Sequence, residues 1–352
     1  MTKQGSLKKT VLVTGGSGYI ASWVVKTLLD EGIEVRATVR SKGNKNKVEH
    51  LLKVAQNSNG KLTLHEADLL KDGAFEGPMD GCEAVFHMAS PFSVEKVKDP
   101  FAALVRPALE GTKNVLNSVN NTPSVKRVVL TSSVVAMYGD ASDISATKRG
   151  VFDESCWNET SSLNHQPYSY SKKVAEEEAW KIANAQDRWD LLVINPGFVM
   201  GPSLSKRMDA QSINFMVSML NGKFKAGTPN MYAAIVDVRD VARAHFLAAT
   251  NPEASGRHVL VERSMSFVDF ARILREKYKD HYPIPRKALP KIMVYLVGPI
   301  MAGLTWKYIR RNLGIPMKWD NSYSIKDLKI EYTPIEKTLI DHAEQLIRDG
   351  LV

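Results

Sequence analysis

Apolar and polar positions alternate along the chain with two periods, one typical of buried strands and the other of amphipathic helices. The first apolar run, residues 11–13, predicts a short strand. After it, apolar side chains recur at helical spacing from Ile20 to Leu29, and Gly32 marks the end of that helix. The chain therefore opens with a strand followed by a helix.

The same order repeats further along the chain. Apolar runs that predict more strands occupy residues 33–40, 62–68, 84–89, 128–131 and 191–194. Helical patterns separate these runs, notably over 100–121 and 169–184. Strands that alternate with helices indicate a parallel sheet covered on both faces. We therefore predict the α/β class, with a Rossmann-type doubly wound parallel sheet.

The alternation becomes irregular after the sixth predicted strand, which indicates a second lobe. A chain of 352 residues also exceeds one typical domain. We assign residues 1–197 to a dinucleotide-binding Rossmann domain, to which 233–262 returns through a strand, a helix and a late strand. Residues 198–232 and 263–352 are assigned to a smaller mixed substrate-binding lobe.

The turn between the first strand and the first helix has the pattern of a phosphate-binding loop. It reads Thr14-Gly15-Gly16-Ser17-Gly18-Tyr19-Ile20-Ala21, with small residues at Gly15, Gly18 and Ala21. Glycines permit a tight turn, and N–H groups at the helix start can hold a pyrophosphate. An ordinary strand-to-helix turn is the alternative, but the flanking strand and helix favour a dinucleotide site.

Basic residues follow the second predicted strand, where an NAD-binding unit would carry an acid for the ribose 2′-hydroxyl. Arg40 ends the strand, and Lys42, Lys45 and Lys47 come shortly after it. Guanidinium and ammonium groups suit a 2′-phosphate. A solvated basic loop is the alternative, but we favour NADP(H) as the cofactor.

Composition narrows the class of protein. An apolar content of 44% and a charged content of 24% are those of an ordinary globular protein. The net charge of +9 suits an anionic cofactor, but no nucleic-acid-binding motif accompanies it, so we expect no nucleic acid partner. Cys82 and Cys156 have no metal-binding spacing, so we expect no metal. Few cysteines and a polar start over residues 1–9 favour the cytoplasm.

One apolar segment, residues 289–306, raises the question of membrane contact. Gly298 and Pro299 break it in the middle, and Arg310 and Arg311 follow it. It is also short for a spanning helix. We interpret it as a helix pair lining the substrate lobe and expect no integral membrane segment. Contact with a membrane surface is the alternative.

Tyr168 and Lys172 lie four residues apart at the start of a predicted helix, so both occupy one helical face. A free phenol is a poor acid at neutral pH, but a nearby ammonium and an oxidised nicotinamide ring lower its pKa. Such a pair also occurs by chance on solvated helices. Here it follows a strand that ends in Thr131, Ser132 and Ser133, whose hydroxyls would lie at the carboxyl edge of the sheet.

Together these motifs resemble extended short-chain dehydrogenases/reductases. Within that family they are similar to the branch of dihydroflavonol reductases, cinnamoyl-CoA reductases and yeast-type methylglyoxal or carbonyl reductases. The matching pieces besides the glycine turn are residues 35–40, 85–91, 129–133, 153–157 and 195–197. The similarity spans residues 10–280, and beyond them only 324–328 and the helix-like end look familiar.

The resemblance implies roles for three residues. Ser133 would polarise a carbonyl group, Tyr168 would donate the proton, and Lys172 would hold the ribose and tune Tyr168. Ser133 is chosen because the second serine of the pair aligns with the family's catalytic serine. The alternative is that Ser132 faces the site.

The resemblance also implies the cofactor contacts. Arg40 and Lys47 would grip the 2′-phosphate. Asp68 would read the adenine edge, and Pro196 would lie beside the nicotinamide. The full set of expected cofactor-binding residues is Thr14, Gly15, Ser17, Gly18, Tyr19, Ile20, Arg40, Lys47, Asp68, Leu69, Met88, Ala89, Ser90, Thr131, Tyr168, Lys172, Pro196 and Val199.

The chain departs from the family pattern at three places. Residues 107–112 hold no counterpart of the Asn that many relatives add as a fourth catalytic residue. Tyr138 stands where dihydroflavonol reductases carry a flavonoid-contacting Asn, and residues 167–172 match the cinnamoyl-CoA reductase signature only in part. Neither plant substrate is therefore predicted. Substrate-binding residues are expected at Phe92, Tyr138, Phe198 and Met200, with core packing as the alternative.

The resemblance implies NADPH-dependent reduction of a ketone or aldehyde to an alcohol, with Tyr168 as general acid. We expect a small hydrophobic or aromatic carbonyl substrate, and a monomer or homodimer. The alternatives are an NAD(P)-dependent 3β-hydroxysteroid-type dehydrogenase and a non-catalytic dinucleotide-binding protein. Arg40 argues against the first, since cells keep NADP mostly reduced. Tyr168 and Lys172 argue against the second, since such proteins usually lose them.

Overall fold

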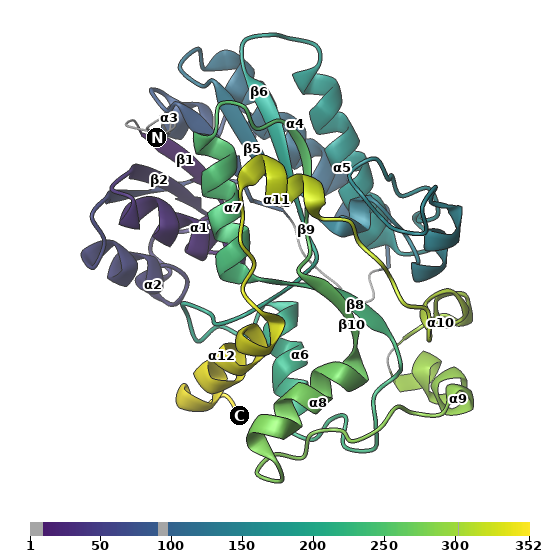
Figure 1. Ribbon diagram of the computed structural model, residues 1–352. Coiled ribbons are helices and arrows are strands. Elements are labelled where there is room, and N and C mark those ends of the chain that lie inside the picture. The colour runs from purple at the N-terminus through teal and green to yellow at the C-terminus, as the bar shows by residue number, and fades with distance from the viewer. Residues whose placement is uncertain (1–9, 91–97, 302) are drawn as a thin grey trace.

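The structure is a computed structural model that describes residues 10–90, 98–301 and 303–352. Figure 1 shows a large lobe built on a twisted sheet and a smaller lobe below it. The large sheet has seven strands in the order β3-β2-β1-β4-β5-β6-β9, and each pair of neighbours is parallel. Its strands are β1 Val11–Thr14, β2 Glu34–Val39, β3 Lys61–Glu66, β4 Ala84–His87, β5 Arg127–Thr131, β6 Asp190–Pro196 and β9 Gly256–Leu260. The predicted α/β class and doubly wound parallel sheet are confirmed.

Helices cover both faces of the large sheet because successive strand side chains point to opposite sides. Val11 and Val13 face one core and Leu12 the other. The first core is closed by α1 Tyr19–Asp30, α2 Lys45–Gln56, α7 Val238–Thr250 and α11 Ser322–Leu328. The second is closed by α3 Glu76–Met79, α4 Arg106–Asn121 and α5 Pro167–Ala183. A π-helical turn, Phe101–Val105, leads into α4, and 3-10 turns span Val134–Ala136 and Ala141–Ala146.

The small lobe is built on a mixed three-stranded sheet, in the order β10-β8-β7. Strand β8 pairs parallel with β7 and antiparallel with β10. The three strands are β7 Phe198–Met200, β8 Tyr232–Asp237 and β10 Arg263–Ser266. The helices of this lobe are α6 Gln211–Leu220, α8 Phe267–Tyr278, α9 Lys291–Met301, α10 Trp306–Asn312 and α12 Ile335–Arg348.

The boundary between the lobes differs at one strand from the sequence-based assignment. Strand β8 opens the segment 233–262 that was assigned to the large lobe, but it pairs instead with β7 and β10. Only α7 and β9 return to the large sheet. The apolar pattern of β8 suits either sheet, so long-range pairing decides its place. A Cβ on Gly197 would lie 2.4 Å from the Ala234 carbonyl oxygen, so this crossing point requires glycine.

The apolar segment 289–306 holds one helix, α9, which runs through Gly298 and Pro299, so the predicted break in the middle is wrong; the next helix, α10, begins only at Trp306. Neither is a candidate to span a bilayer: no helix in the described part of the chain is long and apolar enough to do so.

Candidate active site

The glycine turn connects β1 to α1 in a conformation that few other residues could adopt. Gly15 has φ +66°, and a Cβ there would lie 2.9 Å from the Cα of Ala89. A Cβ on Gly16 would lie 2.8 Å from the Cβ of Ala37. A Cβ on Gly18, which immediately precedes α1, would lie 3.4 Å from the carbonyl oxygen of Gly15, an ordinary contact distance. The turn is therefore tight on its inner side, and the first N–H groups of α1 follow it.

Thr14 joins this turn to the end of β4. Its Oγ1 accepts hydrogen bonds from the backbone N–H groups of Met88 and Ala89, both at 3.0 Å, and lies 3.0 Å from His87 Nδ1. Burial, with a contribution from Lys172, lowers the pKa of His87 to about 3, so the ring is neutral. Four residues predicted to contact a cofactor, Thr14, Gly15, Met88 and Ala89, are thus brought together.

The end of β2 lies beside the same turn. The N–H of Gly15 donates to Thr38 Oγ1 at 3.2 Å. Arg40 is exposed just beyond β2, and Lys47 is half-buried in α2, in a first turn that contains no acidic residue. Two basic residues and a helix N-terminus without acidic residues therefore follow the strand whose end contacts the glycine turn.

The loop after β3 is held by a side chain of α4. Asn114 is buried, donates to the carbonyl oxygens of Leu69 and Lys71 at 3.0 and 2.6 Å, and accepts from Gly73 N–H at 3.2 Å. The exposed Asp68 accepts from the N–H of Leu70. The amide of Asn114 is therefore used to fix the loop after β3.

The two serines after β5 have different surroundings. The hydroxyl of Ser132 is buried and donates to Glu176 Oε2 at 2.5 Å. The hydroxyl of Ser133 is half-buried, caps the turn Val134–Ala136 and donates to the Pro196 carbonyl oxygen at 3.4 Å. Ser132 is therefore bonded inside the fold, whereas Ser133 has two long hydrogen bonds, one accepted from Val135 N–H at 3.3 Å and one donated toward the end of β6.

Tyr168 and Lys172 lie on the first turns of α5, as the sequence predicts. Burial raises the pKa of Tyr168 well above its usual range, so the phenol is protonated at neutral pH. Burial also lowers the pKa of Lys172 to about 8, while the carboxylate of Glu176 acts in the opposite direction. The ammonium group donates to Ser90 Oγ at 3.3 Å, at the end of β4. The helix thus carries a protonated phenol on its first turn and brings the cation of Lys172 to the segment that follows β4.

Glu176 is the main site residue that sequence reasoning missed. Its side chain is buried, and Oε1 forms an ion pair with Arg257 Nε at 2.6 Å. Oε2 accepts from Ser132 and, at 2.8 Å, from Asn195. Glu176 follows Lys172 by four residues, so the two side chains share one face of the helix. This spacing could have indicated Glu176 from the sequence. Lys172 and Glu176 both line a cavity of about 20 Å³, room for one water molecule.

The remaining predicted residues have mixed surroundings. The hydroxyl of Thr131 is bonded to His245 Nε2 of α7 at 2.7 Å. Val199 and Met200 are buried in β7, with Met200 fully inside the core of the small lobe. Phe92 lies outside the described residues. Met200 therefore packs in the core, which was the alternative to its predicted substrate contact. The predicted cofactor contacts of Thr131 and Val199 stay predictions.

Aromatic rings from distant parts of the chain gather around two predicted substrate residues. Tyr138 lies 5.1 Å from Phe152 and 5.5 Å from Trp319, between ring centroids. Phe198 lies 5.5 Å from Phe215 of α6 in an edge-to-face contact. These groups are apolar and half-open, since Tyr138, Trp319, Phe198 and Phe215 all keep partial exposure.

The small lobe holds the glycine turn directly. Tyr19 donates its hydroxyl to the Gly201 carbonyl oxygen at 2.7 Å, and Trp23 Nε1 donates to that of Pro202 at 2.8 Å. Arg207 Nη1 donates to the carbonyl oxygen of Ser17 at 2.6 Å. The loop after β7 is therefore attached to the predicted cofactor site, although no local pattern in the sequence indicated it.

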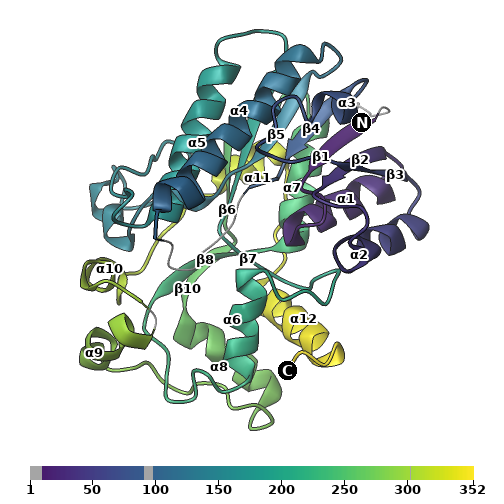
Figure 2. The ribbon, with the colours of Figure 1, turned by 180° about the vertical axis from the view of Figure 1, so that it is seen from behind.

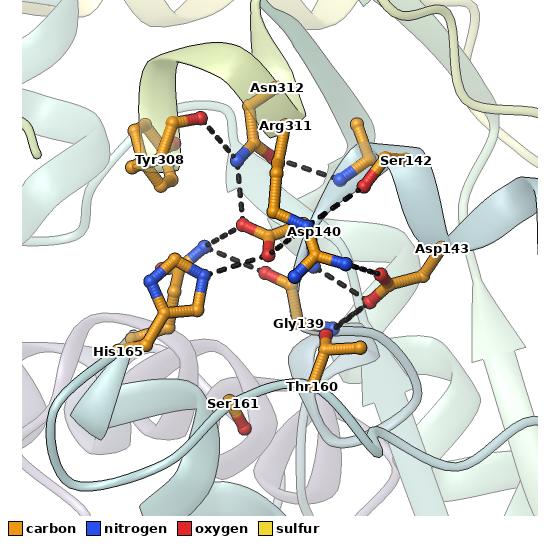
Figure 3. Close-up of polar contacts among 12 residues, drawn as sticks. Gly139, Asp140, Ser142, Asp143, Thr160, Ser161, His165, Tyr308, Arg311 and Asn312 are labelled. Carbon is orange, nitrogen blue, oxygen red and sulfur yellow. Dashed lines mark hydrogen bonds and ion pairs between the residues drawn. The ribbon is translucent and has the colours of Figure 1, made fainter. Parts of the chain in front are cut away.

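A second buried network connects α10 with the loop that precedes Tyr168 (Figure 3). Asp140 is fully buried, 2.7 Å from His165 Nε2, and accepts from Asn312 Nδ2 at 2.7 Å. Arg311 adds an ion pair to Asp140 at 3.3 Å. Because His165 stands three residues before Tyr168, the network ties the start of α5 to the small lobe.

Comparison with known proteins identifies the family. Residues 11–261 match the model of the NAD dependent epimerase/dehydratase family. The chain belongs to this family. It is 40% identical over 347 residues to cinnamoyl-CoA reductase CAD2 of Medicago truncatula, covering 97% of this chain and 96% of that protein. The predicted extended short-chain dehydrogenase/reductase branch is confirmed.

Two solved structures are similar to this chain over nearly its whole length. The complex of Gre2 with NADPH from Candida albicans has a TM-score of 0.78 and 30% identity, covering 96% of this chain and 98% of that one. Yeast methylglyoxal/isovaleraldehyde reductase Gre2 complexed with NADPH has a TM-score of 0.76 and 27% identity, covering 97% and 100%.

Proposed function

We propose that the protein reduces a ketone or aldehyde to an alcohol with NADPH, and that Tyr168 is the general acid. Three observations support this proposal: Ser133 follows β5 and bonds to Pro196, Lys172 bonds to Ser90 after β4, and Tyr168 lies on the same first turns of α5 as Lys172. Relatives named as cinnamoyl-CoA reductases and Gre2 complexes with NADPH support the same reaction class.

The residues around the glycine turn fit such a cofactor. The turn can pack against Ala89 and Ala37 only because Gly15 and Gly16 lack side chains, and the N–H groups of α1 that would bind a pyrophosphate follow directly. Arg40 and Lys47 would bind the 2′-phosphate, and Lys172 the ribose hydroxyls. When bound, NADPH supplies the hydride for the carbonyl carbon.

The chain's own groups would complete the reaction at the carbonyl oxygen. Ser133 would donate a hydrogen bond to that oxygen and polarise the bond. Tyr168 would then transfer its proton to the oxygen, so the carbonyl gains one hydride and one proton. The phenol is protonated beforehand. The ammonium of Lys172 would stabilise the phenolate that remains.

The substrate we propose is a small, hydrophobic or aromatic carbonyl compound. The ring clusters around Tyr138 and Phe198 support this choice, because they offer apolar surface from both lobes. The basic residues after β2 favour NADPH and hence the reductive direction over a 3β-hydroxysteroid-type dehydrogenase.

The test of the mechanism is Tyr168→Phe, which removes one oxygen. We expect kcat to fall by about two to four orders of magnitude, while NADPH affinity barely changes. The matched control is Tyr170→Phe, two residues further along α5 and about 200° around the helix, which should keep the parental rate. A Tyr168→Phe protein that binds NADPH and turns over at nearly the parental rate would contradict the assignment.

A further inference from the structure

The most exposed large hydrophobic side chains of the described chain all lie within one short stretch. Ile292, Leu296, Ile300 and Trp306 are between 63% and 86% exposed, and Met293 is also exposed. Elsewhere in the described ranges, no large hydrophobic side chain exceeds 53%. These five residues belong to α9 and the first position of α10. Apolar surface gathered in this way usually marks a binding face.

The outward direction of these side chains follows from how α9 is attached. Its inner face carries Val294 and Gly298, which are buried. A Cβ on Gly298 would lie 3.2 Å from Ile309, so α9 and α10 pack closely there. Ile292, Leu296 and Ile300 follow each other at four-residue intervals on the opposite, solvent-facing side. The fold therefore does not need their apolar character.

The charges in this region have one sign. From residue 281 to 319 the chain has seven Lys and Arg residues and no Asp or Glu. Lys287, Lys291, Lys307 and Arg310 are exposed, and none of them forms an ion pair within the ranges that the structure describes. The five apolar and four basic side chains together are called the α9–α10 surface.

This surface lies at one edge of the small lobe, on the side away from α12, in both views (Figures 1 and 2). We propose that the α9–α10 surface binds peripherally to an anionic phospholipid membrane. Helices that lie in a membrane interface combine exposed Ile, Leu and Trp with Lys and Arg. The apolar side chains would enter the headgroup region, and the cations would face the lipid phosphates and carboxylates.

The charges favour a membrane over the other possible occupants. Two copies of this chain meeting through the α9–α10 surface would bring like charges together. The central part of a protein interface is usually depleted of lysine, whereas this surface contains three. An anionic bilayer supplies both the opposite charge and an apolar layer.

The experiment measures flotation of the full chain with phosphatidylcholine vesicles, with and without phosphatidylserine. It contains no cofactor or substrate, so it is independent of the proposed function. We expect binding to the phosphatidylserine vesicles that weakens at high salt. Two triple variants test the two parts of the surface. Binding should fall about tenfold or more when the apolar side chains are removed in Ile292→Ser/Leu296→Ser/Ile300→Ser. It should fall by a similar factor when the charge is reversed in Lys291→Glu/Lys307→Glu/Arg310→Glu.

The matched control is Leu52→Ser/Ile325→Ser, which removes exposed apolar side chains on α2 and α11 and should bind like the parent. Unchanged melting curves would show that the variants fold. Three results would overturn the proposal. The first is that the parent protein does not float with phosphatidylserine vesicles, and the second is that it floats equally with both vesicles and the charge-reversed variant does the same. The third is that the parent binds no vesicles but forms a dimer in sedimentation velocity, which the triple serine variant dissociates.

Discussion

Two residues one helical turn apart on α5 are coupled, because the carboxylate of Glu176 influences the ionisation of Lys172. Lys172 loses its proton more easily than an exposed lysine because burial disfavours its ammonium, and the carboxylate of Glu176 partly compensates. Glu176 itself is buried only because Arg257, Ser132 and Asn195 satisfy both of its oxygens. The charge on Lys172 therefore depends in part on a buried carboxylate whose two oxygens are both bonded within the fold.

This dependence predicts a pH effect. If the protonated form of Lys172 supports catalysis, kcat/KM should fall as the pH rises through about 8. Glu176→Gln removes the negative charge that favours the ammonium, so the pKa of Lys172 should drop and the descending limb should move by about one pH unit to the acid side. The measurement is a pH profile of NADPH oxidation.

Glu177→Gln is the control for this shift, because Glu177 is the next residue on α5 but is exposed. It should leave the profile in place. An unmoved limb in Glu176→Gln, with NADPH binding intact, would show that Glu176 has only a structural role.

Arg40 predicts the cofactor preference. Arg40→Ala should weaken NADPH binding by about tenfold or more and change NADH binding little, because only NADPH carries the 2′-phosphate. A fluorescence titration with each nucleotide measures this. Equal losses for both nucleotides would place Arg40 elsewhere than at the 2′-phosphate.

At the scale of elements, the β1–α1 unit shows why a turn and its neighbours must be considered together. The first N–H groups of α1 are presented by a turn whose inner side lies against β4 and β2, where Ala89 and Ala37 leave no room for a side chain. The strand register that places Val13 beside both Ala37 and Phe86 fixes this contact.

The prediction for this element compares two glycines of positive φ. Gly15→Ala should destabilise the fold by about 2–4 kcal/mol and abolish tight NADPH binding, since its Cβ meets the backbone of Ala89. Gly32, at the other end of α1, has φ +78° and nothing within 4 Å. Gly32→Ala should therefore cost only about 1 kcal/mol and leave NADPH binding unchanged. Urea denaturation and cofactor titration measure both effects, and similar losses in the two variants would contradict the argument.

At the scale of the whole molecule, the two lobes are joined at the proposed site rather than beside it. The loop after β7 contacts the glycine turn through Gly201, Pro202 and Arg207. On the other side, Asn312 and Asp140 connect α10 to the start of α5. These contacts fix the small lobe to the glycine turn on one side and to the start of α5 on the other.

The ring clusters contributed by both lobes predict the substrate preference. Aromatic or branched carbonyl compounds should have higher kcat/KM than small polar sugars, because they would bury more apolar area against Tyr138, Trp319 and Phe198. A panel of aryl ketones, branched aldehydes, glyceraldehyde and a nucleotide sugar, read by NADPH oxidation, measures this. Faster turnover of glyceraldehyde or the nucleotide sugar would reject the preference.

Local patterns in the sequence were sufficient for the strands of the large sheet, the glycine turn and the Tyr168–Lys172 pair. Each depends on residues within a few positions of one another, where periodicity and turn chemistry act directly. The strand predicted over 128–131 is β5, Arg127–Thr131, and the predicted helix over 169–184 is α5, Pro167–Ala183.

Tertiary structure alone decided the features that join distant segments. The pairing of β8 with β7, the ion pair of Glu176 with Arg257, and the direction of the apolar face of α9 each depend on which elements meet. An apolar stripe has the same pattern whether it faces a core or solvent, and a carboxylate has no partner until the chain folds. Sequence therefore determined the local chemistry, and long-range packing determined which of those groups act together.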